Sequence, residues 1–506
     1  MKDHDTETGS AALTRRGLLQ GVGCALAAAA LPATRLLGAA ESSETAAPAA
    51  GADASPSPIG RLGAYMSEAA GREISPEATE KAKHHILDTI AAMVSGAELA
   101  PALVAFKYAR AHSGERTATI VGSDLLCGPA EAALINGMLA HSDETDDSHA
   151  PSQLHPGCGI VPAALAAGEH FGNSGTVFLR AVVLGYDLAA RFDMALGGLP
   201  FQMATHRSTH SIGNNFGAGA AAGCAAGLNA QQMRWMIDYS AQQASGSAAW
   251  QRDTEHVSKS LVFGGRPARN GVASALLIQL GATGVDDILT GPDNFFAAMN
   301  PKADRAKLTA KLGELYEVTR TNIKKWTVGS PIQAPLDAVQ NIRKRRDFEA
   351  GDVQKLVVRV ATSEAKTVNN REIPGISMQH MLAVMLVDKT VSFHSAHDMA
   401  RMKDPVVVRT RAKIQLTPDE ELERLYPERQ SIVEITLNDG TVLTERVKAV
   451  RGTAENPMTA DEVVAKCRDL MVPFLGAEKT GRLIERILHL EDVKDLRDLR
   501  PLLQRS

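Results

Sequence analysis

Hydrophobic positions recur at helical intervals through most of this chain up to about residue 290. The clearest pattern begins at Ser75, which can cap a helix; Pro76 suits the first turn and Gly96 suits the end. The apolar residues of this segment share one helical face: Ala82, Ile86, Leu87, Ile90, Ala91 and Val94. The pattern therefore predicts a helix over residues 76–96 that buries this face.

Two later segments rich in glycine and alanine, residues 216–228 and 271–284, continue the helical pattern. Glycine costs a helix interior about 1 kcal/mol relative to alanine. Its frequency here indicates that helix backbones approach one another closely. We therefore expect a tightly packed helical domain.

The pattern changes after about residue 320, where apolar and polar residues begin to alternate with the period of a β-strand. Asn438, Asp439 and Gly440, between two such runs, predict a hairpin turn. Helical spacing returns at Thr459, which forms a capping-box pattern with Glu462. The expected strands and hairpin cover residues 353–362, 406–416 and 431–447.

We therefore predict a mainly α-helical protein with an α+β second domain. The large, all-helical domain comprises residues 59–320 together with the C-terminal residues 456–506. The α+β domain, with an antiparallel sheet, is inserted between them at residues 321–455.

The N-terminus has the pattern of an export signal. Arg15 and Arg16 precede a modest Ala/Leu-rich run, and small residues near Ala40 offer a cleavage point. We interpret residues 1–40 as a twin-arginine signal peptide, which predicts an exported, periplasmic protein that engages the twin-arginine export machinery. An alanine-rich N-terminal helix is the alternative. Residues 41–58 are rich in Ala, Ser and Pro, which predicts a disordered spacer.

Charge and cysteine content narrow the possible functions. A formal net charge of −4 and a sequence pI of about 6.4 give no electrostatic support for nucleic-acid binding. The apolar run of the signal is shorter than the roughly 20 residues of a membrane-spanning helix, so we expect no stable membrane insertion after signal removal. The cysteines form no CxxC pair, so a cysteine-ligated zinc or iron–sulfur site has no motif.

Residues 139–157 concentrate titratable side chains. Asp143, Glu144, Asp146 and Asp147 fall within five residues, and three histidines accompany them. Crowded carboxylates repel one another, so some must find cations, backbone N–H groups or protons. A metal site, an acid/base site and a solvated acidic turn are all open at this point. The spacing matches neither HExxH nor an EF-hand loop. The possible N and O ligands of a metal are His141, Asp143, Asp146, Asp147, His149 and His155.

Two later segments favour the acid/base interpretation. His206 and His210 lie in a glycine-rich corner before a helix, and Lys259, Arg266 and Arg269 lie between two later helices. A histidine, a carboxylate and a lysine that meet in one cleft could bind a polycarboxylate and move a proton beside it. Each of these residues alone is more often a structural polar group, so the prediction depends on their shared context. We expect no bound metal.

The order of these segments resembles the MmgE/PrpD family, whose dehydratases and decarboxylases act on carboxylates such as 2-methylcitrate and cis-aconitate. "HSDETDDS" followed by "LHPG" is similar to the family motif HxxDxDDT…HP. "FLRAVVLGYDLAARF" and "GAGAAAGCAAGLNAQQM" resemble the two helices that follow, and "KSLVFGGRPARNGVASALL" resembles the family's lysine and Gly-Arg stretch. The resemblance spans about residues 58–490.

The resemblance implies catalytic groups at His155, His206, Lys259, Asp147 and Glu144. His206 matches the family's second histidine better than its competitor His210 does. Glu144 stands where the family usually has aspartate. Lys259 matches the family lysine, although one extra residue precedes the Gly-Arg that follows it.

The resemblance also implies substrate-binding groups at Ser148, Lys324, Arg266, His380 and His210. Ser148 replaces a family threonine, and His380 stands where an active-site tyrosine is often found. Gln333 stands where many members have histidine. These departures fit a divergent branch of the family.

The implied activity is that of a lyase without a cofactor, acting next to a carboxylate on a small di- or tricarboxylate, and we expect a homodimer. In a dehydration a base removes a proton α to a carboxylate, whereas in a decarboxylation an acid protonates the carbanion left by CO₂. His155 is the leading proton carrier, with Asp147 or Glu144 supporting its imidazole. Lys259 and Lys324 are candidates for stabilising enolate-like charge.

Two other functions remain open. An epimerase or isomerase of a dicarboxylate would use the same kind of proton transfer without losing a group. A non-catalytic, exported carboxylate-binding protein would use the cations alone. Turnover of a panel of di- and tricarboxylates separates these alternatives from a lyase.

We predict that replacing both signal arginines by lysine, in the double variant Arg15→Lys, Arg16→Lys, prevents export, because the paired arginines are the feature that the twin-arginine machinery reads. Cell fractionation should find the variant in the cytoplasm with its N-terminus intact, and the parent in the periplasm cleaved near Ala40. A variant that reaches the periplasm as efficiently as the parent would show that the segment is no such signal.

Overall fold

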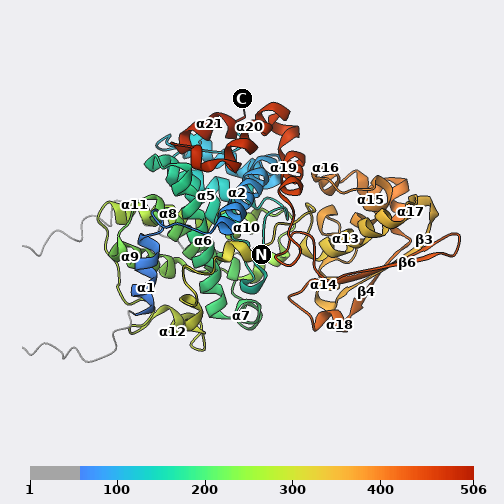
Figure 1. The fold of residues 1–506 in the computed structure, drawn as a ribbon, viewed down its shortest axis with the longest axis horizontal. Coiled ribbons are helices and arrows are strands. Elements are labelled where there is room, and N and C mark those ends of the chain that lie inside the picture. The colour runs from blue at the N-terminus through green and yellow to red at the C-terminus, as the bar shows by residue number, and fades with distance from the viewer. Residues whose placement is uncertain (1–56, 506) are drawn as a thin grey trace, which may run out of the picture. The chain divides into compact units, whose positions relative to one another are not determined.

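The computed structural model describes residues 57–505 (Figure 1). The predicted signal peptide and all but the last two residues of the predicted spacer lie outside the described residues. The first helix, α1 (Pro58–Ser67), begins at the last residue of that spacer. The prediction of a mainly α-helical protein with an α+β part is confirmed. Along the chain, helices precede and follow the region that forms the four-stranded sheet.

Helix α2 (Pro76–Gly96) confirms the helix predicted from its caps. The Ser75 side chain accepts a hydrogen bond from the amide of Ala78, and Pro76 occupies the first turn. No single described helix is long and apolar enough to cross a membrane, although α2 and α3, bent by 85°, pass the same test as a pair. The other long helices outside the sheet region are α3 (Ala100–Ala111), α4 (Pro129–Ala140), α5 (Gly157–Phe171), α6 (Gly175–Leu196), α8 (Thr209–Ala225), α9 (Ala230–Gln243), α11 (Arg266–Gln279), α19 (Ala460–Leu475) and α20 (Ala477–Leu488).

Glycines bring helix backbones into direct contact, as the sequence predicts. A Cβ atom at Gly271 would lie 2.5 Å from the carbonyl carbon of Ala218, so the two glycine-rich segments pack against each other as α8 and α11. A Cβ at Gly137 of α4 would lie 2.6 Å from the carbonyl carbon of Gly264. The second contact fixes residues 261–265 against α4, beside the acidic segment that follows this helix.

The sheet has the strand order β4-β3-β5-β6. The predicted hairpin is confirmed as β5 and β6, which pair Ile432 with Arg446. β3 pairs antiparallel with β5, as expected, but it runs parallel to β4. The sheet is therefore mixed, because a helical crossover joins β3 to β4 and a parallel pair needs such a connection. The strands are β3 (Val353–Ala361), β4 (Ile414–Asp419), β5 (Ser431–Leu437) and β6 (Val442–Val447).

The strand predicted over residues 406–416 is wrong in its first half. Helix α17 (Pro405–Arg411) occupies that part, and β4 begins only after it. The Asp404 side chain accepts hydrogen bonds from the amides of Val406 and Val407. This cap favours a helix strongly enough to override the strand preference of the β-branched residues that follow.

Buried apolar side chains form two separate clusters. One joins residues 59–323 with residues 458–503 and Phe393, and the other lies within residues 326–450. In the second cluster α13 (Ser330–Arg345) packs against β5 and β6, and α15 (Met378–Asp388) packs against β4 (Figure 1). Shorter helices of this region are α14 (Thr362–Val368), α16 (Phe393–His397) and α18 (Glu420–Glu423).

The C-terminal helices contact the acidic segment directly. The predicted capping box is confirmed, with Thr459 and Glu462 each bonding the other's backbone amide at the start of α19. Lys466 of α19 lies 2.6 Å from Asp88 of α2 and donates a hydrogen bond to the carbonyl of Thr145 at 3.0 Å. A residue near the end of the chain thus holds the backbone of the segment that follows α4.

Candidate active site

The acidic segment connects α4 to α5, and its four carboxylates have separate partners. Asp143 and Glu144 are half-buried, whereas Asp146 and Asp147 are fully buried. Carboxylates this close can be ionised together only if each has its own donors or cations.

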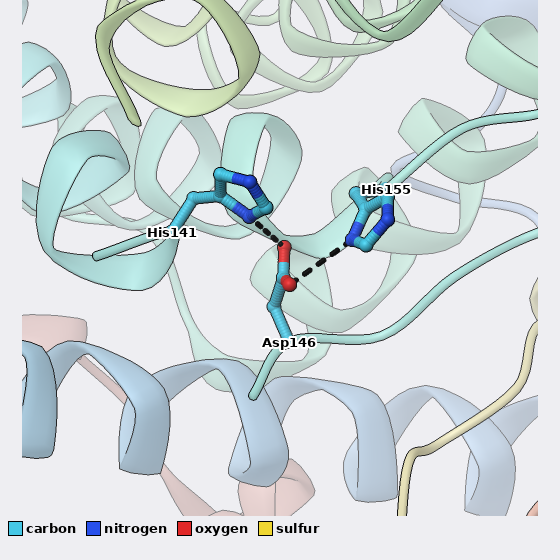
Figure 2. A group of neighbouring side chains, drawn as sticks. All are labelled: His141, Asp146 and His155. Carbon is cyan, nitrogen blue, oxygen red and sulfur yellow. Dashed lines mark hydrogen bonds and ion pairs between the residues drawn. The ribbon is translucent and has the colours of Figure 1, made fainter. Parts of the chain in front are cut away.

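Asp146 joins two histidines, as Figure 2 shows. Its Oδ2 accepts a hydrogen bond from Nδ1 of His141 at 2.8 Å, and its Oδ1 accepts one from Nδ1 of His155 at 3.0 Å. The ammonium of Lys324 lies 3.5 Å from Oδ1. The His155 ring is 12% exposed, so its other nitrogen remains available to a ligand.

The charge states in this group follow from burial and neighbouring charges. Burial alone would raise the pKa of the Asp146 carboxyl, but His141, His155 and Lys324 hold it well below its usual range. Burial lowers the pKa of His141 to about 4. At neutral pH Asp146 is therefore ionised and His141 is neutral, so His141 carries its single ring proton on Nδ1, where it donates to the carboxylate.

Asp147 anchors the start of α5 and does not support His155, contrary to the sequence analysis. Its Oδ1 accepts a hydrogen bond from the amide of Gly157 at 2.9 Å. Its Oδ2 accepts hydrogen bonds from the Tyr186 hydroxyl at 2.6 Å and from Nδ1 of His85 at 2.8 Å. A carboxylate is favourable at a helix N-terminus. Because Asp146 and Asp147 point in different directions, it is Asp146 that hydrogen-bonds the imidazole of His155.

Glu144 is paired with cations and does not contact His155 either. It forms an ion pair with Lys259 and accepts a hydrogen bond from Nε2 of His256 at 3.0 Å. Its backbone carbonyl accepts a hydrogen bond from Lys324 at 2.8 Å. Burial would raise the pKa of Glu144, but Lys259 and His256 hold it well below its usual range. The charge of Lys259 is thus matched within the protein, and Lys259 does not line the main cavity.

Asp143 pairs with a histidine of α16. Its carboxylate is 3.0 Å from Nε2 of His397 and accepts hydrogen bonds from the amide and hydroxyl of Thr145. Burial would lower the pKa of His397, but the hydrogen bond to Asp143 raises it above its ordinary value. Both residues line a smaller cavity of about 160 Å³, together with Glu144 and His256.

The histidine beside His155 is His210, the weaker of the two sequence candidates. The ring centroids of His155 and His210 are 5.2 Å apart, and both residues line the main cavity. His206 is exposed at the end of α7 (Gly198–Thr205) and lines neither cavity. Burial, with the charges of His155 and Lys259, holds the pKa of His210 well below its usual range, which makes this ring neutral.

An aromatic ring organises these histidines. Phe263 stacks on His141 with a centroid distance of 4.6 Å and on His210 with a distance of 4.0 Å. Lys259 lies 5.4 Å from the centre of the same ring. We infer that Phe263 fixes the orientation of both imidazoles.

Phe263 belongs to a π-helical turn, Leu261–Gly265, between α10 (Val257–Ser260) and α11. A π-turn accommodates one more residue than an α-turn and is frequent at functional sites. The extra residue that the family resemblance implies between Lys259 and the Gly-Arg that follows falls within this turn.

A cavity of about 340 Å³ lies next to His155. One wall comes from residues 148–155 with His210, and the other from parts of residues 320–333, 426–429 and 448–455. Basic groups outnumber acidic ones on these walls, which favours an anionic ligand. The three arginines among them are also paired with glutamates that do not line the cavity. The charged lining residues are Arg320, Lys324, Arg429, Lys448 and Arg451, with Glu428 and Glu455.

Three of the predicted substrate-binding residues line this cavity: Ser148, Lys324 and His210. Arg266 does not. Its guanidinium donates to the carbonyl and to the hydroxyl of Ser245, the latter at 3.0 Å.

His380 and Gln333, two of the departures from the family pattern, are both held by the surrounding protein. His380 is fully buried in α15 outside the cavity, and burial lowers its pKa to about 4. Gln333 lines the cavity, but its amide is bonded to the backbone of Trp326 and Val328. We infer that Gln333 shapes the wall and has little capacity left for a ligand.

The group His141, Asp146 and His155 is also the one described set of side chains whose ligand atoms lie close enough together, within 4.8 Å, to be considered for a metal. Both carboxylate oxygens already bond imidazole nitrogens, and the Lys324 ammonium places a positive charge 3.5 Å from one of them. A cation between them would face that ammonium, so the donor set fits a hydrogen-bonded network better than a metal centre.

Sequence reasoning assigned no catalytic or substrate-binding role to Asp146, His141 or Phe263, and named the first two only as possible metal ligands. Asp146 and His141 were visible as members of the acidic motif, but their spacing does not reveal which neighbour points toward His155. Phe263 is an ordinary apolar residue, whose place depends on the π-turn.

Comparisons with known proteins agree with this architecture. Residues 60–307 match the MmgE/PrpD N-terminal domain, and residues 326–492 match the MmgE/PrpD C-terminal domain. The cis-aconitate decarboxylase of Homo sapiens is 24% identical over 451 residues, which cover 84% of this chain and 90% of the relative. That of Aspergillus terreus is 24% identical over 474 residues, covering 87% and 94%, and that of Mus musculus is 25% identical over 454 residues, covering 84% and 88%. With a separate match to each of its two halves, the chain belongs to the MmgE/PrpD family.

Proposed function

We propose that this protein is a cofactor-independent lyase that acts next to a carboxylate of a small di- or tricarboxylate. The observation that carries the proposal is the hydrogen-bonded pair of His155 and ionised Asp146 at the wall of a cation-rich cavity. Decarboxylation of the cis-aconitate type is the first candidate reaction, because the relatives reported above are named cis-aconitate decarboxylases. Dehydration of the 2-methylcitrate type is the second.

The cations of the cavity account for substrate binding. Lys324 is almost fully buried and reaches both the cavity and Asp146, so its charge acts at the same place as His155. Lys448 and Arg320 line the same wall and can receive a second carboxylate of the substrate. Of the two, Arg320 already pairs with Glu317 at 3.0 Å. A cavity of about 340 Å³ has the size of a small-molecule site.

His155 is the proton carrier of the proposed reaction. Its Nδ1–H is directed to Asp146, which leaves Nε2 for the substrate. In a decarboxylation the bond to the departing carboxylate breaks, CO₂ leaves, and the electron pair stays on the substrate carbon. The imidazolium of His155 then donates its Nε2 proton to that carbon and later recovers a proton from water. Lys324 stabilises the negative charge, and such electrostatic stabilisation is usually the largest single contribution to catalysis.

The same groups could perform the second reaction. Neutral His155 would accept a proton α to a carboxylate through Nε2, and the β-hydroxyl would leave as water after protonation. Neutral His210, beside it in the cavity, is placed to donate a hydrogen bond to the leaving oxygen. An epimerase would stop after the first proton transfer and return a proton to the opposite face.

Export through the twin-arginine machinery and assembly as a homodimer are further proposals. The first rests on the N-terminal sequence and the second on the family resemblance.

We predict that the mature protein releases CO₂ from at least one member of a panel of unsaturated and hydroxylated di- and tricarboxylates that includes cis-aconitate and 2-methylcitrate. CO₂ release, water loss and solvent deuterium incorporation should be measured on each compound, with His155→Ala protein as the control for contaminating activity. Water loss alone would favour the dehydratase, and deuterium exchange without group loss the epimerase. Saturable binding without any of the three would contradict a lyase.

We predict that His155→Ala and His210→Ala each lower kcat, and that His206→Ala does not. Loss of a general acid or base costs roughly 10²–10⁴-fold in rate, and we expect His155→Ala to fall within this range. His206→Ala is the matched control, because its ring is exposed outside the cavity. Steady-state kinetics with thermal denaturation of each variant checks the expectation. A loss in His206→Ala as large as that in His210→Ala would restore the first interpretation of the sequence.

We predict that activity does not depend on a metal. The ammonium of Lys324 lies beside Asp146 and would repel a metal cation bound to that carboxylate. Prolonged treatment with a strong chelator should leave kcat unchanged, and elemental analysis should find substoichiometric zinc, iron and manganese. Activity that is lost to the chelator and restored by one of these metals would refute the hydrogen-bonded interpretation of this group.

A further inference from the structure

The side chain of His141 has one hydrogen-bond partner among the described residues, and that partner is Asp146. Its Nδ1 donates to Oδ2 of Asp146 at 2.8 Å, and its buried Nε2 has no hydrogen-bond partner among the described residues. The ring is fully buried and lines neither cavity. His141 therefore lies behind the main cavity, and its one side-chain hydrogen bond connects it to His155 through Asp146. Its ring also lies edge-on to that of His155, with 5.2 Å between the centroids.

The Asp146 carboxylate needs this contact to face His155. The carboxylate is fully buried, so an oxygen without a donor would be costly. If Oδ2 lost its donor, the group could rotate and turn both oxygens toward the ammonium of Lys324, which already lies 3.5 Å from Oδ1. The oxygen that now accepts the hydrogen bond of His155 would then be shared or withdrawn.

His141 is itself held firmly. It follows α4, whose last turn is in backbone contact with the π-turn through Gly137 and Gly264. Its ring stacks on Phe263 of that turn, with an angle of 21° between the planes. Phe263 also stacks on His210, so one ring sets the position of a residue in the cavity and of a residue behind it.

We propose that His141 is a positioning residue, which holds the Asp146 carboxylate in the orientation that accepts the hydrogen bond of His155. The proposal rests on the proposed role of His155 as proton carrier. The titratable groups around His155 are Asp146, His141, His210 and Lys324, and of these only Asp146 is an anion. An imidazolium at His155 is therefore stabilised by one carboxylate, whose direction His141 controls.

The chain contains a matched control for this proposal in the pair of His85 and Asp147. Both histidines are fully buried, both use Nδ1, and both donate to an aspartate at 2.8 Å. Asp147 differs from Asp146 in its other partners, which are Tyr186 and the amide of Gly157. Loss of either histidine removes the same kind of hydrogen bond, but only loss of His141 affects the carboxylate that supports His155.

The test compares His141→Phe with His85→Phe by proton NMR of protein labelled with ¹⁵N-histidine. A carboxylate-bonded imidazole Nδ1–H gives a resolved downfield resonance. We expect His85→Phe to remove one such resonance, its own, and His141→Phe to remove two, its own and that of His155. The assignment of the second resonance follows from its absence in His155→Ala. Loss of only one resonance in His141→Phe would overturn the proposal.

The pH profile of kcat provides the second readout. In a decarboxylation, where the His155 imidazolium is the acid, we expect the alkaline limb to move to lower pH by about one unit in His141→Phe, which is the size expected for a lost charge-assisted hydrogen bond. Activity lost near neutral pH should then recover on acidification, which a merely structural defect would not do. In a dehydration, where neutral His155 is the base, the acidic limb should move by the same amount in the same direction. His85→Phe should keep the limb of the parent even if it unfolds at a lower temperature. An unmoved limb in His141→Phe would also overturn the proposal.

His141→Asn separates the donor from the ring. The asparagine amide nitrogen occupies nearly the position of Nδ1 but cannot stack on Phe263 as imidazole does. We expect this variant to retain the His155 resonance and the alkaline limb of the parent, and it keeps the proposal testable if His141→Phe fails to fold. If His141→Asn lost both the His155 resonance and the alkaline limb of the parent, the proposal would be overturned. The NMR arm needs no turnover, so failure of the wild-type protein on the whole substrate panel, with the resonances as expected, would refute the proposed function and leave the positioning role intact.

Discussion

Mutual repulsion among four neighbouring carboxylates is the constraint on which this site depends. Asp143, Glu144, Asp146 and Asp147 follow one another within five residues in a largely buried segment, where charge repulsion is poorly screened. The protein meets the constraint by giving each one a different set of donors. Those donors lie far apart in the chain: His85 lies in α2 and His397 in α16. Lys466 of α19 fixes the backbone between the acids through the carbonyl of Thr145. The tertiary structure around the cavity is arranged to a large extent by these pairings.

Locally encoded features of this protein could be predicted from the sequence. The caps of α2 and the box at Thr459 involve residues three positions apart, and the β5–β6 hairpin needs only its turn. The parallel pairing of β3 with β4 could not be predicted in this way, because it joins strands separated by a helical crossover. The strand expected over residues 406–416 failed because the cap at Asp404 outweighs the preference of three valines for strands.

The same division applies to the site. Residue types indicated an acid/base site with a basic wall, and His155, Lys324 and His210 do line one cavity. The direction of each side chain could not be predicted. Asp146 and Asp147 are adjacent in sequence, but Asp146 bonds His155 in the loop before α5. Asp147 instead bonds His85 of α2 and Tyr186 of α6. The π-turn illustrates the difficulty well. One residue more in a helix rotates everything before it by about 100° relative to everything after it, so Lys259 turns toward Glu144 while α11 keeps its contact with α8.

The contact between Lys466 and the carbonyl of Thr145 has a consequence for the order in which this molecule is completed. The two residues are 321 positions apart in the chain. A ribosome adding roughly 5–20 residues per second makes the acidic segment tens of seconds before it makes the lysine that clamps it. During that interval the segment's carboxylates are present on a nascent chain without this support, and a chain truncated before α19 never gains it. The support that Lys466 gives to the acidic segment is therefore available only after the chain has been made as far as α19.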